Sequence, residues 1–397
     1  MISDYPGSVD VLTQRVHCER EKLLRIAALI TDVVDGDARF LPTARHYDSL
    51  ARDLATELDG IAALAAGRKG DTISWDRLNR LLERAEKVVI EAQCFLESVL
   101  YRVHLLDRGS GDAADAFLAY LGAGSQVRHR IVTGMSAGSA SINHTLDLVR
   151  LPFPAVTVWD LPVVAHEFGH HLVRELRHVS GNDERPLKRF TQDNLAAEVR
   201  FRKGDPQASA DADAAKLRLE ETAADAYATY TLGPAYAYAC LVLRVDPTRA
   251  MRSPTTHPSW CRRIHLAAAV LRAIKRRTGR QQYAQAADCV EALWRSMTDS
   301  PPVAPRTAAH VARHADVLVE CLARHAHDAL YDAGSRPASI MECLTADGEV
   351  SLPSGTTPAH VVNAAWSWRL GEWDRFSALG PRVNARALKL ICSTSGP

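Results

Sequence analysis

The sequence predicts a mainly α-helical protein of the α+β class, with a small β element near the middle and helical regions on either side. Apolar residues recur at helical spacing in the first part of the chain. The stretch from Leu121 to Asp160 is rich in glycine, serine, proline and β-branched residues, and helical patterns return after it. These shifts divide the chain into a helical N-terminal region at 1–120, a core at 121–275 and a helical C-terminal region at 276–397.

The size and charge of the chain limit its function. Its 397 residues, 47% hydrophobic and 24% charged, suit a soluble globular protein with a sizeable buried core. Lysine and arginine number 48 against 47 acidic residues, so no overall positive field favours nucleic acid or an anionic membrane surface. We therefore expect no nucleic-acid partner, and the sequence carries no indication of the oligomeric state.

The cysteines and the apolar segments indicate a compartment. The eight cysteines are scattered and lack C-x-x-C spacing, which is typical of reduced thiols in a cytoplasm. The first residues, MISDYPGSVD, lack the basic start and the apolar stretch of a secretory signal. Apolar runs such as AYAYACLVL at 235–243 are shorter than the ~20 residues that a membrane-spanning helix needs. We expect a cytoplasmic protein without membrane insertion.

Two long amphipathic helices are predicted in the N-terminal region. In HYDSLARDLATELDGIAALAAG, apolar residues recur at steps of four and three from Leu50 onward. A second helix begins near Ser74 and keeps this period to Val103, before Gly109 and Gly111. Long helices with short connections predict an antiparallel bundle.

The central region is expected to contain strands that lead into a helix. Residues 130–133 and 155–159 are the two segments that we assign to strands. The second strand would run directly into a helix, for which Asp160 is a suitable N-cap and Pro162 suits the first turn.

Helices are expected to continue beyond this point. A polar loop surrounds SGNDERPLK at 180–188, and a helix follows from about Ser209 to Leu232, where Gly233-Pro234 ends it. Another helix begins near Pro258. Proline-rich segments predict connectors between the C-terminal helices at 300–305 and 351–358.

The segment VVAHEFGHHL at 163–172 carries the chemistry. His166 and His170 lie four apart on one helix face, so both imidazoles can reach a single ion. Glu167 points in a neighbouring direction, where it can take a proton from a metal-bound water and pass it to a leaving amine. Gly169 keeps this turn of the helix small. The alternative is two ordinary histidines on an ordinary helix, and a third ligand distinguishes the two.

A catalytic zinc site needs a third protein ligand and an open position for water. The metzincin pattern would require a glycine at 173 and a histidine at 176, where the chain has Val173 and Leu176. The downstream segment LEETAADAYATYTLGP instead supplies Glu221, with Asp225 one turn later to accept the second ring N–H of a ligating histidine. Glu220 is the alternative third ligand, and a solvated acidic helix face is the other explanation of these residues.

Three ordered segments, HEFGH, ETAAD and TTHPSWCRRI, resemble the gluzincin zinc metallopeptidases of the CAAX prenyl endopeptidase type. That family pairs H-E-x-x-H with E-x-x-A-D and with a later T-H-P segment followed by an arginine. The later segment falls here on Thr256, His257, Pro258 and Arg263. The resemblance covers about residues 155–270 and implies a zincin-like fold for the core.

The resemblance implies a set of site residues. One zinc ion per chain would be held by His166, His170 and Glu221, with Glu167 as the catalytic base. Asp225 would be the hydrogen-bond partner of a zinc ligand.

Two further roles come from the third segment. His257 would be a catalytic residue that donates to the developing oxyanion, and Arg263 would tie the ligand helix in place. Alternatively, His257 caps the start of the helix at Pro258.

The sequence therefore predicts a zinc metalloendopeptidase that hydrolyses peptide bonds of a protein or peptide substrate, using water acidified toward a pKa of ~7. The best-known relatives are integral membrane enzymes, whereas this chain has no predicted spanning helix, so a prenylated membrane substrate is not expected. The alternatives are a zinc hydrolase of a small amide or peptide-like metabolite, a catalytically idle metal-binding regulatory protein, and a helical scaffold without metal.

Other polar groups are weaker candidates. His310 and His314 share the four-residue spacing, near His325 and His327, but no glutamate follows His310 as it does in the main motif. Three serines near His144 lack the G-x-S-x-G pattern of a nucleophile elbow, which favours a flexible loop: Ser136, Ser139 and Ser141.

Three features near the motif have structural explanations beside functional ones. His171 is expected to line the cleft or to pack against the core. The segment from Arg130 to Ile142 is a candidate strand edge for binding extended substrate. One of four tyrosines near the third-ligand helix can hydrogen-bond a tetrahedral intermediate, although core packing is the expected role: Tyr227, Tyr230, Tyr236 and Tyr238.

Overall fold

The computed structural model of this chain describes thirteen segments. They are residues 8–34, 38–67, 72–103, 109–125, 132–136, 141–143, 148–152, 157–176, 185–202, 212–298, 303–334, 337–348 and 351–394. By its internal contacts the chain divides into two units, which are described separately. The first unit comprises residues 1–108, 132–139 and 145–154, and the second comprises residues 109–131, 140–144 and 155–397.

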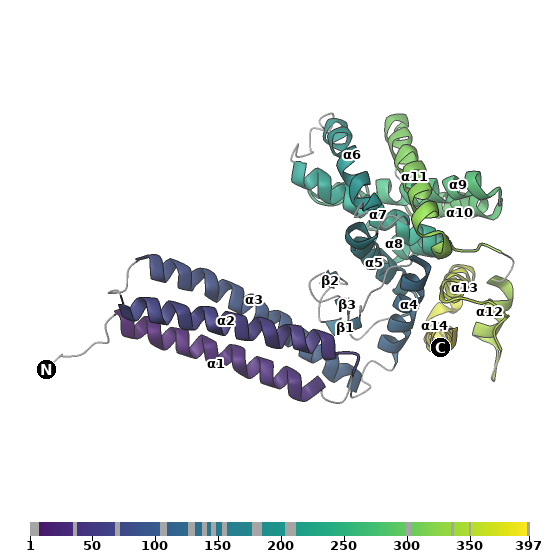
Figure 1. Cartoon of the computed structure of the whole chain (residues 1–397). Helices are drawn as coiled ribbons and strands as arrows, with labels where there is room; N and C mark the ends of the chain where they lie inside the picture. The colour runs from purple at the N-terminus through teal and green to yellow at the C-terminus, as the bar shows by residue number, and fades with distance from the viewer. Residues whose placement is uncertain are drawn as a thin grey trace. The chain divides into compact units, whose positions relative to one another are not determined.

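Three long helices build the first unit: α1 (Ser8–Val34), α2 (Leu41–Gly67) and α3 (Thr72–Val103). They pack side by side in Figure 1, and each contacts the other two. Residues at helical spacing meet in one apolar core, which includes Leu23 of α1, Leu54 of α2 and Phe95 of α3. The expectation that these residues are helical is confirmed; α1 was not predicted individually, and α2 and α3 begin before the positions that periodicity indicated.

Two short parallel strands belong to the same unit: β1 (Val132–Ser136) and β3 (Leu148–Pro152). Their register pairs Val132 with Leu148 and Ser136 with Pro152. Arg102 near the end of α3 is buried, and its Nη1 lies 3.1 Å from Oγ1 of Thr133 in β1. This bond joins the helices to the strands.

The second unit is almost entirely helical. It contains the short strand β2 (Ser141–Asn143) and three 3-10 turns, η1 (Pro247–Arg249), η2 (His327–Ala329) and η3 (Trp373–Arg375). Its helices are α4 (Ser110–Ser125), α5 (Leu161–Glu175), α6 (Pro186–Arg202), α7 (Ala212–Leu232), α8 (Pro234–Leu243), α9 (Trp260–Thr278), α10 (Gln282–Met297), α11 (Pro305–His325), α12 (Pro337–Thr345), α13 (Pro358–Gly371) and α14 (Phe376–Thr394). The prediction of a mainly helical protein is confirmed.

Helix α7 forms the centre of this unit. Every residue from Glu221 to Leu232 is buried, and α5, α6, α9 and α11 all contact the helix. A helix that is buried all round must present small or apolar side chains in every direction, which the alanines of this segment do. Gly233 follows with a φ of 56°, a left-handed conformation that glycine adopts without strain, and Pro234 begins α8.

The helices that carry the motifs begin and end largely as predicted. Pro162 occupies the first turn of α5. Ser259 caps α9 by accepting a hydrogen bond from the backbone N–H of Arg262. Asp160 occupies the predicted N-cap position of α5, but its side chain makes no capping bond, because the carboxylate accepts bonds from the backbone N–H and the hydroxyl of Thr157 instead.

Two other expectations are corrected. Residues 157–159 do not form a strand but lead into a turn, and residues 155–156 lie outside the described segments. The polar stretch after α5 contains a helix that was not predicted, α6, because SGNDERPLK suggested only a loop. The first predicted strand corresponds to β1 from Val132 onward, while residues 130–131 lie outside the description.

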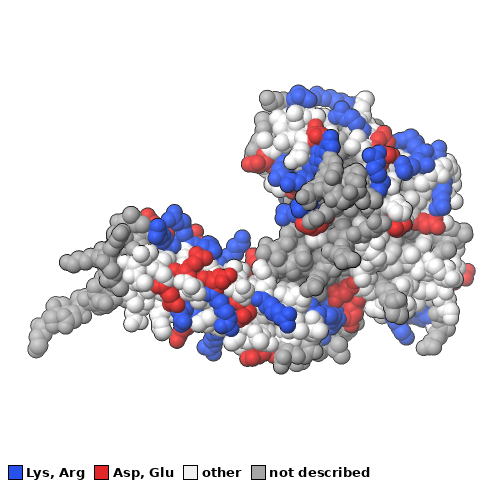
Figure 2. All heavy atoms as spheres, viewed as in Figure 1, with Lys and Arg blue, Asp and Glu red and all other residues white. Residues whose placement is uncertain are grey.

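The surface and the helix lengths bear on the expected environment. On the face that Figure 2 shows, basic and acidic side chains are interspersed. Across the described segments, no helix combines the length and the apolar character that crossing a bilayer requires. The division of the chain at residues 120 and 275 stays a prediction.

Candidate metal centre

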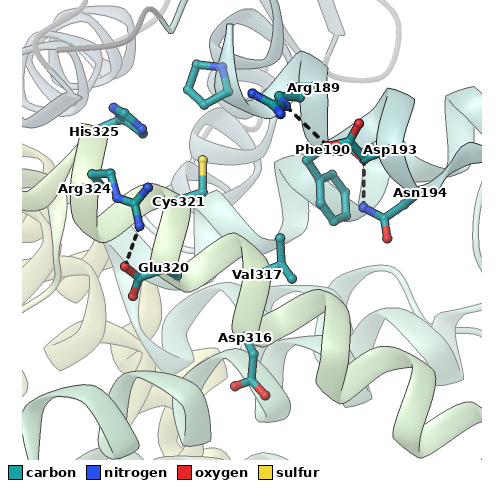
Figure 3. Close-up of a pocket in the computed structure, with 11 residues that line it drawn as sticks. Arg189, Phe190, Asp193, Asn194, Asp316, Val317, Glu320, Cys321, Arg324 and His325 are labelled. Carbon is teal, nitrogen blue, oxygen red and sulfur yellow. Dashed lines mark hydrogen bonds and ion pairs between the residues drawn. The ribbon is translucent and has the colours of Figure 1, made fainter. Parts of the chain in front are cut away.

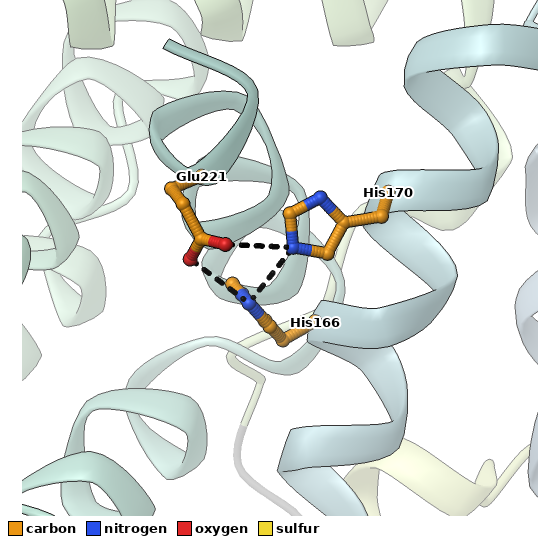
Figure 4. A group of neighbouring side chains, drawn as sticks. All are labelled: His166, His170 and Glu221. Atoms are coloured by element: carbon orange, nitrogen blue, oxygen red, sulfur yellow. Dashed lines mark hydrogen bonds and ion pairs between the residues drawn. The ribbon is translucent and has the colours of Figure 1, made fainter. Parts of the chain in front are cut away.

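Three side chains from two helices converge on one point. His166 and His170 project from α5 and Glu221 projects from α7, and all three point toward one another (Figure 4). The Nε2 atoms of the two histidines lie 3.2 Å apart. The Glu221 carboxylate oxygens lie 3.4 Å from Nε2 of His166 and 3.2 Å from Nε2 of His170. Among the described residues, this is the group of histidine, cysteine and acidic side chains whose ligand atoms could hold a metal ion.

Close contact between the two helices makes this convergence possible. A Cβ atom added to Gly169 would lie 2.8 Å from Cα of Ala224 and 3.0 Å from its carbonyl oxygen. Helix α5 therefore approaches the backbone of α7 so closely that only glycine fits at this position. The glycine inside H-E-x-x-H sets the distance between the imidazoles and the glutamate.

Asp225 contacts His166 at the ring nitrogen that faces away from the cluster. Its Oδ1 lies 3.0 Å from Nδ1 of His166, so the Nδ1–H donates to the carboxylate and Nε2 faces the cluster. Asp225 lies one turn after Glu221 on α7 and is completely buried. The structure therefore brings the carboxylate that the sequence placed behind a histidine into contact with that histidine.

Arg263 of α9 neutralises this buried carboxylate. Its Nε and Nη2 donate to the two oxygens of Asp225 at 2.8 Å and 2.6 Å, a bidentate pair. The same Nη2 lies 3.5 Å from Oε2 of Glu221, and the guanidinium carbon lies 4.6 Å from the ring centroid of Trp260. Arg263 thus holds α9 against the two acidic residues of α7.

Tyr236 of α8 completes this network, and sequence reasoning did not single it out. Its hydroxyl donates to Oδ1 of Asp225 and lies 3.2 Å from Nδ1 of His166. The tyrosine and His166 rings stack with an interplanar angle of 6°. The tyrosine's position two residues after Pro234 of the Gly-Pro break was visible in the sequence, but the break alone did not indicate which of the four tyrosines would reach the site.

The network perturbs the pKa values of its members. Burial by itself lowers the pKa of His166, but hydrogen bonds with Asp225 and Glu221 outweigh burial and raise the pKa to about 9. Burial raises the pKa values of Glu221 and Asp225, but their cationic neighbours lower them below the ordinary carboxyl range. The two carboxylates are therefore ionised at neutral pH and present negative charge to the cluster.

The remaining predicted residues lie near the cluster. Glu167 follows His166 on α5 and is half-buried. Nε2 of His257 lies 3.3 Å from Oε1 of Glu221, and the His257 side chain is 48% exposed. The Glu220 side chain does not point toward the histidines, because its carboxylate lies 4.0 Å from the Lys216 ammonium group.

The segment before α9 is held by a buried arginine that the sequence did not reveal. Nη1 of Arg218 donates to the carbonyl oxygen of Thr255 at 2.6 Å, and the hydroxyl of Thr256 lies 2.8 Å from Nδ1 of His257. These bonds fix the backbone on which His257 stands. The Ser259 hydroxyl caps α9, so the alternative role of His257 as a cap does not apply.

The weaker candidates have other roles. Nε2 of His310 lies 3.1 Å from the Glu198 carboxylate, and His310 packs on His314. His171 is buried, with its ring 5.8 Å from that of Phe168. Tyr227, Tyr230 and Tyr238 are also buried. Ser139 and His144 lie outside the described residues, as does part of the candidate substrate edge at 130–142.

Two cavities formed by described residues of the second unit are not lined by the three converging side chains. A cavity of about 610 Å³ lies between α6 and α11, where Arg189 pairs with Asp193 and Arg324 pairs with Glu320 (Figure 3). None of the three converging residues lines it. A smaller cavity of about 340 Å³ lies beside α5, α6 and α7.

Comparison of the chain with protein-family models, with curated proteins and with solved structures finds no match. The function must therefore be argued from the chemistry of the site.

Proposed function

We propose that this protein is a zinc-dependent metallopeptidase with a zincin-like core of the gluzincin type. The observation that carries the proposal is the convergence of His166, His170 and Glu221 on one point, with their ligand atoms all within 4.8 Å of one another. Two imidazoles and one carboxylate form a donor set that suits zinc and leaves a fourth position open.

The donor set has further properties that fit a divalent ion. Oε2 of Glu221 is buried, and its nearest cationic neighbours, Nε2 of His166 and Nη2 of Arg263, lie at 3.4 Å and 3.5 Å without a well-formed hydrogen bond, so the oxygen can accept a further positive partner. The Nδ1–H of His166 donates to Asp225. Nε2 of the same imidazole therefore faces the point on which the three side chains converge and can coordinate a metal ion there. A cation at that point would satisfy both groups.

The chain's own residues supply the acid–base chemistry. A bound zinc ion would polarise a carbonyl and lower the pKa of a water ligand. Glu167, adjacent to His166 and partly exposed, accepts a proton at its carboxylate and returns it to the departing amine. His257 stands at the exposed side of the cluster, where its imidazole can donate to an oxyanion.

The proposal is tested by metal analysis and peptide hydrolysis on the full chain. We expect one zinc per chain by mass spectrometry of the metal and cleavage of an unstructured protein such as casein. Glu167→Gln should keep the zinc and lose cleavage by a factor on the order of 10² or more. Wild-type protein that binds no zinc, or a Glu167→Gln variant that cleaves normally, contradicts the proposal.

A further inference from the structure

The cavity of about 340 Å³ beside the cluster is rich in basic side chains. Its wall is formed by the C-terminal end of α5, the first half of α6 and the first half of α7. Four cations line it, from three helices and the residue before α6: Arg174, Arg185, Lys188 and Lys216. Two carboxylates, Glu175 and Glu220, also line it, so the wall carries a net excess of positive charge.

Three of these four cations have no acidic partner among the described residues. Lys216 is exposed, and its ammonium lies 4.0 Å from the Glu220 carboxylate, at the limit of a salt bridge, so this pair contributes little. Within the described part of the chain, no carboxylate lies at salt-bridge distance from Arg174, Arg185 or Lys188. The cavity between α6 and α11 differs, because its arginines Arg189 and Arg324 pair with acids in its own wall (Figure 3).

The basic cavity lies one helical turn from the candidate metal centre. Arg174 follows His170 by four residues and so lies on the same face of α5, about 6 Å further along the helix axis. On α7, Glu220 in the cavity wall directly precedes Glu221 in the cluster. An extended peptide advances about 3.3 Å per residue, so this separation corresponds to roughly two residues of substrate.

We propose that this cavity binds a carboxylate of the substrate, one or two residues from the bond that is cleaved. The inference rests on the proposed peptidase function and adds the substrate class to it. Arginine offers a planar fork that matches a carboxylate, and lysine adds a point charge. Apolar wall residues such as Val173 and Leu195 would contact the methylene groups that carry the acid.

The carboxylate can come from an aspartate or glutamate side chain or from the chain terminus, and a cleavage screen separates these sources. A random peptide mixture is digested once with free C-termini and once with amidated C-termini, and the cut sites are read by mass spectrometry. Enrichment of Asp and Glu near the cleaved bond in both mixtures would show that the bound carboxylate belongs to an Asp or Glu side chain. Cleavage restricted to bonds near a free terminus assigns the terminal carboxylate. Cleavage without preference for either overturns the inference.

Variants connect the preference to the cavity. Arg174→Gln and Lys188→Gln should each lower kcat/KM for an acidic peptide about tenfold, mainly through KM, since each removes one charge-assisted hydrogen bond. The matched peptide with Gln in place of Glu should be unaffected. Lys389→Gln, an exposed lysine on α14, is the control and should change neither peptide. Both peptides carry an amidated C-terminus, so equal losses on the two would refute the side-chain carboxylate; equal losses on a free-acid peptide and its amide would refute the terminal carboxylate.

A binding experiment separates failure of this inference from failure of the proposed function. The probes are a blocked alanine pentapeptide with one central glutamate and its glutamine counterpart, titrated into the full-length Glu167→Gln protein and followed by NMR. Tighter binding of the glutamate peptide, lost in the added Arg174→Gln change, supports the cavity even when wild-type protein cleaves nothing. Equal binding of the glutamate and glutamine peptides, together with equal binding of a free-acid peptide and its amide, overturns the inference even when cleavage is observed.

Discussion

At the scale of single residues, Glu221 and Glu220 provide a matched pair of neighbouring carboxylates. Glu221 reaches both imidazoles, while Glu220 lies beside Lys216. We predict that Glu221→Gln lowers the zinc content from one per chain to near zero after dialysis against a weak chelator, because one of three donors loses its charge. Glu220→Gln should retain full zinc. The opposite ranking of the two variants would move the ligand assignment to Glu220.

Asp225 would act on a bound metal through another residue. Its carboxylate orients the ring of His166 and at the same time pairs with the buried Arg263. Asp225→Asn should therefore weaken zinc affinity by roughly 10- to 100-fold, measured by competition with a chromogenic chelator. It should also destabilise the metal-free protein by about 3–5 kcal/mol, because Arg263 loses its buried partner. Unchanged zinc affinity would remove Asp225 from the support of His166, whatever the loss of stability.

At the scale of elements, the contact of α5 with α7 is set by Gly169. A methyl group there would meet Cα of Ala224 at 2.8 Å, and backbone cannot move aside as a flexible side chain can. We predict that Gly169→Ala costs about 1–3 kcal/mol of unfolding free energy in urea and also lowers zinc affinity, because the helices must separate.

The control for that prediction lies in the N-terminal bundle. A Cβ added to Gly60, inside α2, meets nothing within 4 Å. Gly60→Ala should therefore stabilise the protein by about 0.4–1 kcal/mol through helix propensity and unfolded-state entropy. If Gly169→Ala behaves like Gly60→Ala, the close approach of the two helices is refuted.

At the scale of the whole second unit, Glu198 joins four helices. This completely buried carboxylate of α6 accepts bidentate bonds from Arg262 of α9 at 2.8 Å and 2.7 Å. Its oxygens also lie 3.1 Å from His310 of α11 and 3.5 Å from Arg218 of α7. Because Arg218 also holds the segment before His257, this network connects the stability of the unit to the geometry of the site.

The network makes stability depend on pH. Burial alone would raise the pKa of Glu198, but Arg262 and His310 lower it below its ordinary value of 4.5. The ionised carboxylate therefore stabilises the fold above about pH 4.5, and this contribution is lost as pH falls through the lower folded value. We predict that Glu198→Gln costs about 3–5 kcal/mol near neutral pH.

Urea unfolding from about pH 7 to about pH 3 checks both the size and the sign. The difference between wild type and Glu198→Gln should shrink below about pH 4.5, because the Glu198 carboxyl group is then protonated in the unfolded wild-type protein while it stays ionised in the folded protein. A difference that stays constant over this range would show that the charge of Glu198 is not what stabilises the unit.

The local features of the fold and of the site could be predicted from the sequence. The spacing of His166 and His170 places them on one face of any helix, whatever surrounds it, and the apolar periods around Leu54 and Phe95 require amphipathic helices. Pro162 and Gly233 mark a helix start and a helix end because of their own backbone geometry. Each of these depends on interactions over a few residues.

Only the tertiary structure decided which distant groups meet. The choice of Glu221 over Glu220, the contact of the Tyr236 hydroxyl with Asp225, and the burial of Glu198 in an unpredicted helix depend on how α6, α7, α8 and α9 pack. Adjacent residues on a helix point about 100° apart, so a small rotation would exchange one glutamate for the other. Packing contacts between segments far apart in the chain determine that rotation. The sequence pattern of a single segment gives no information about these contacts.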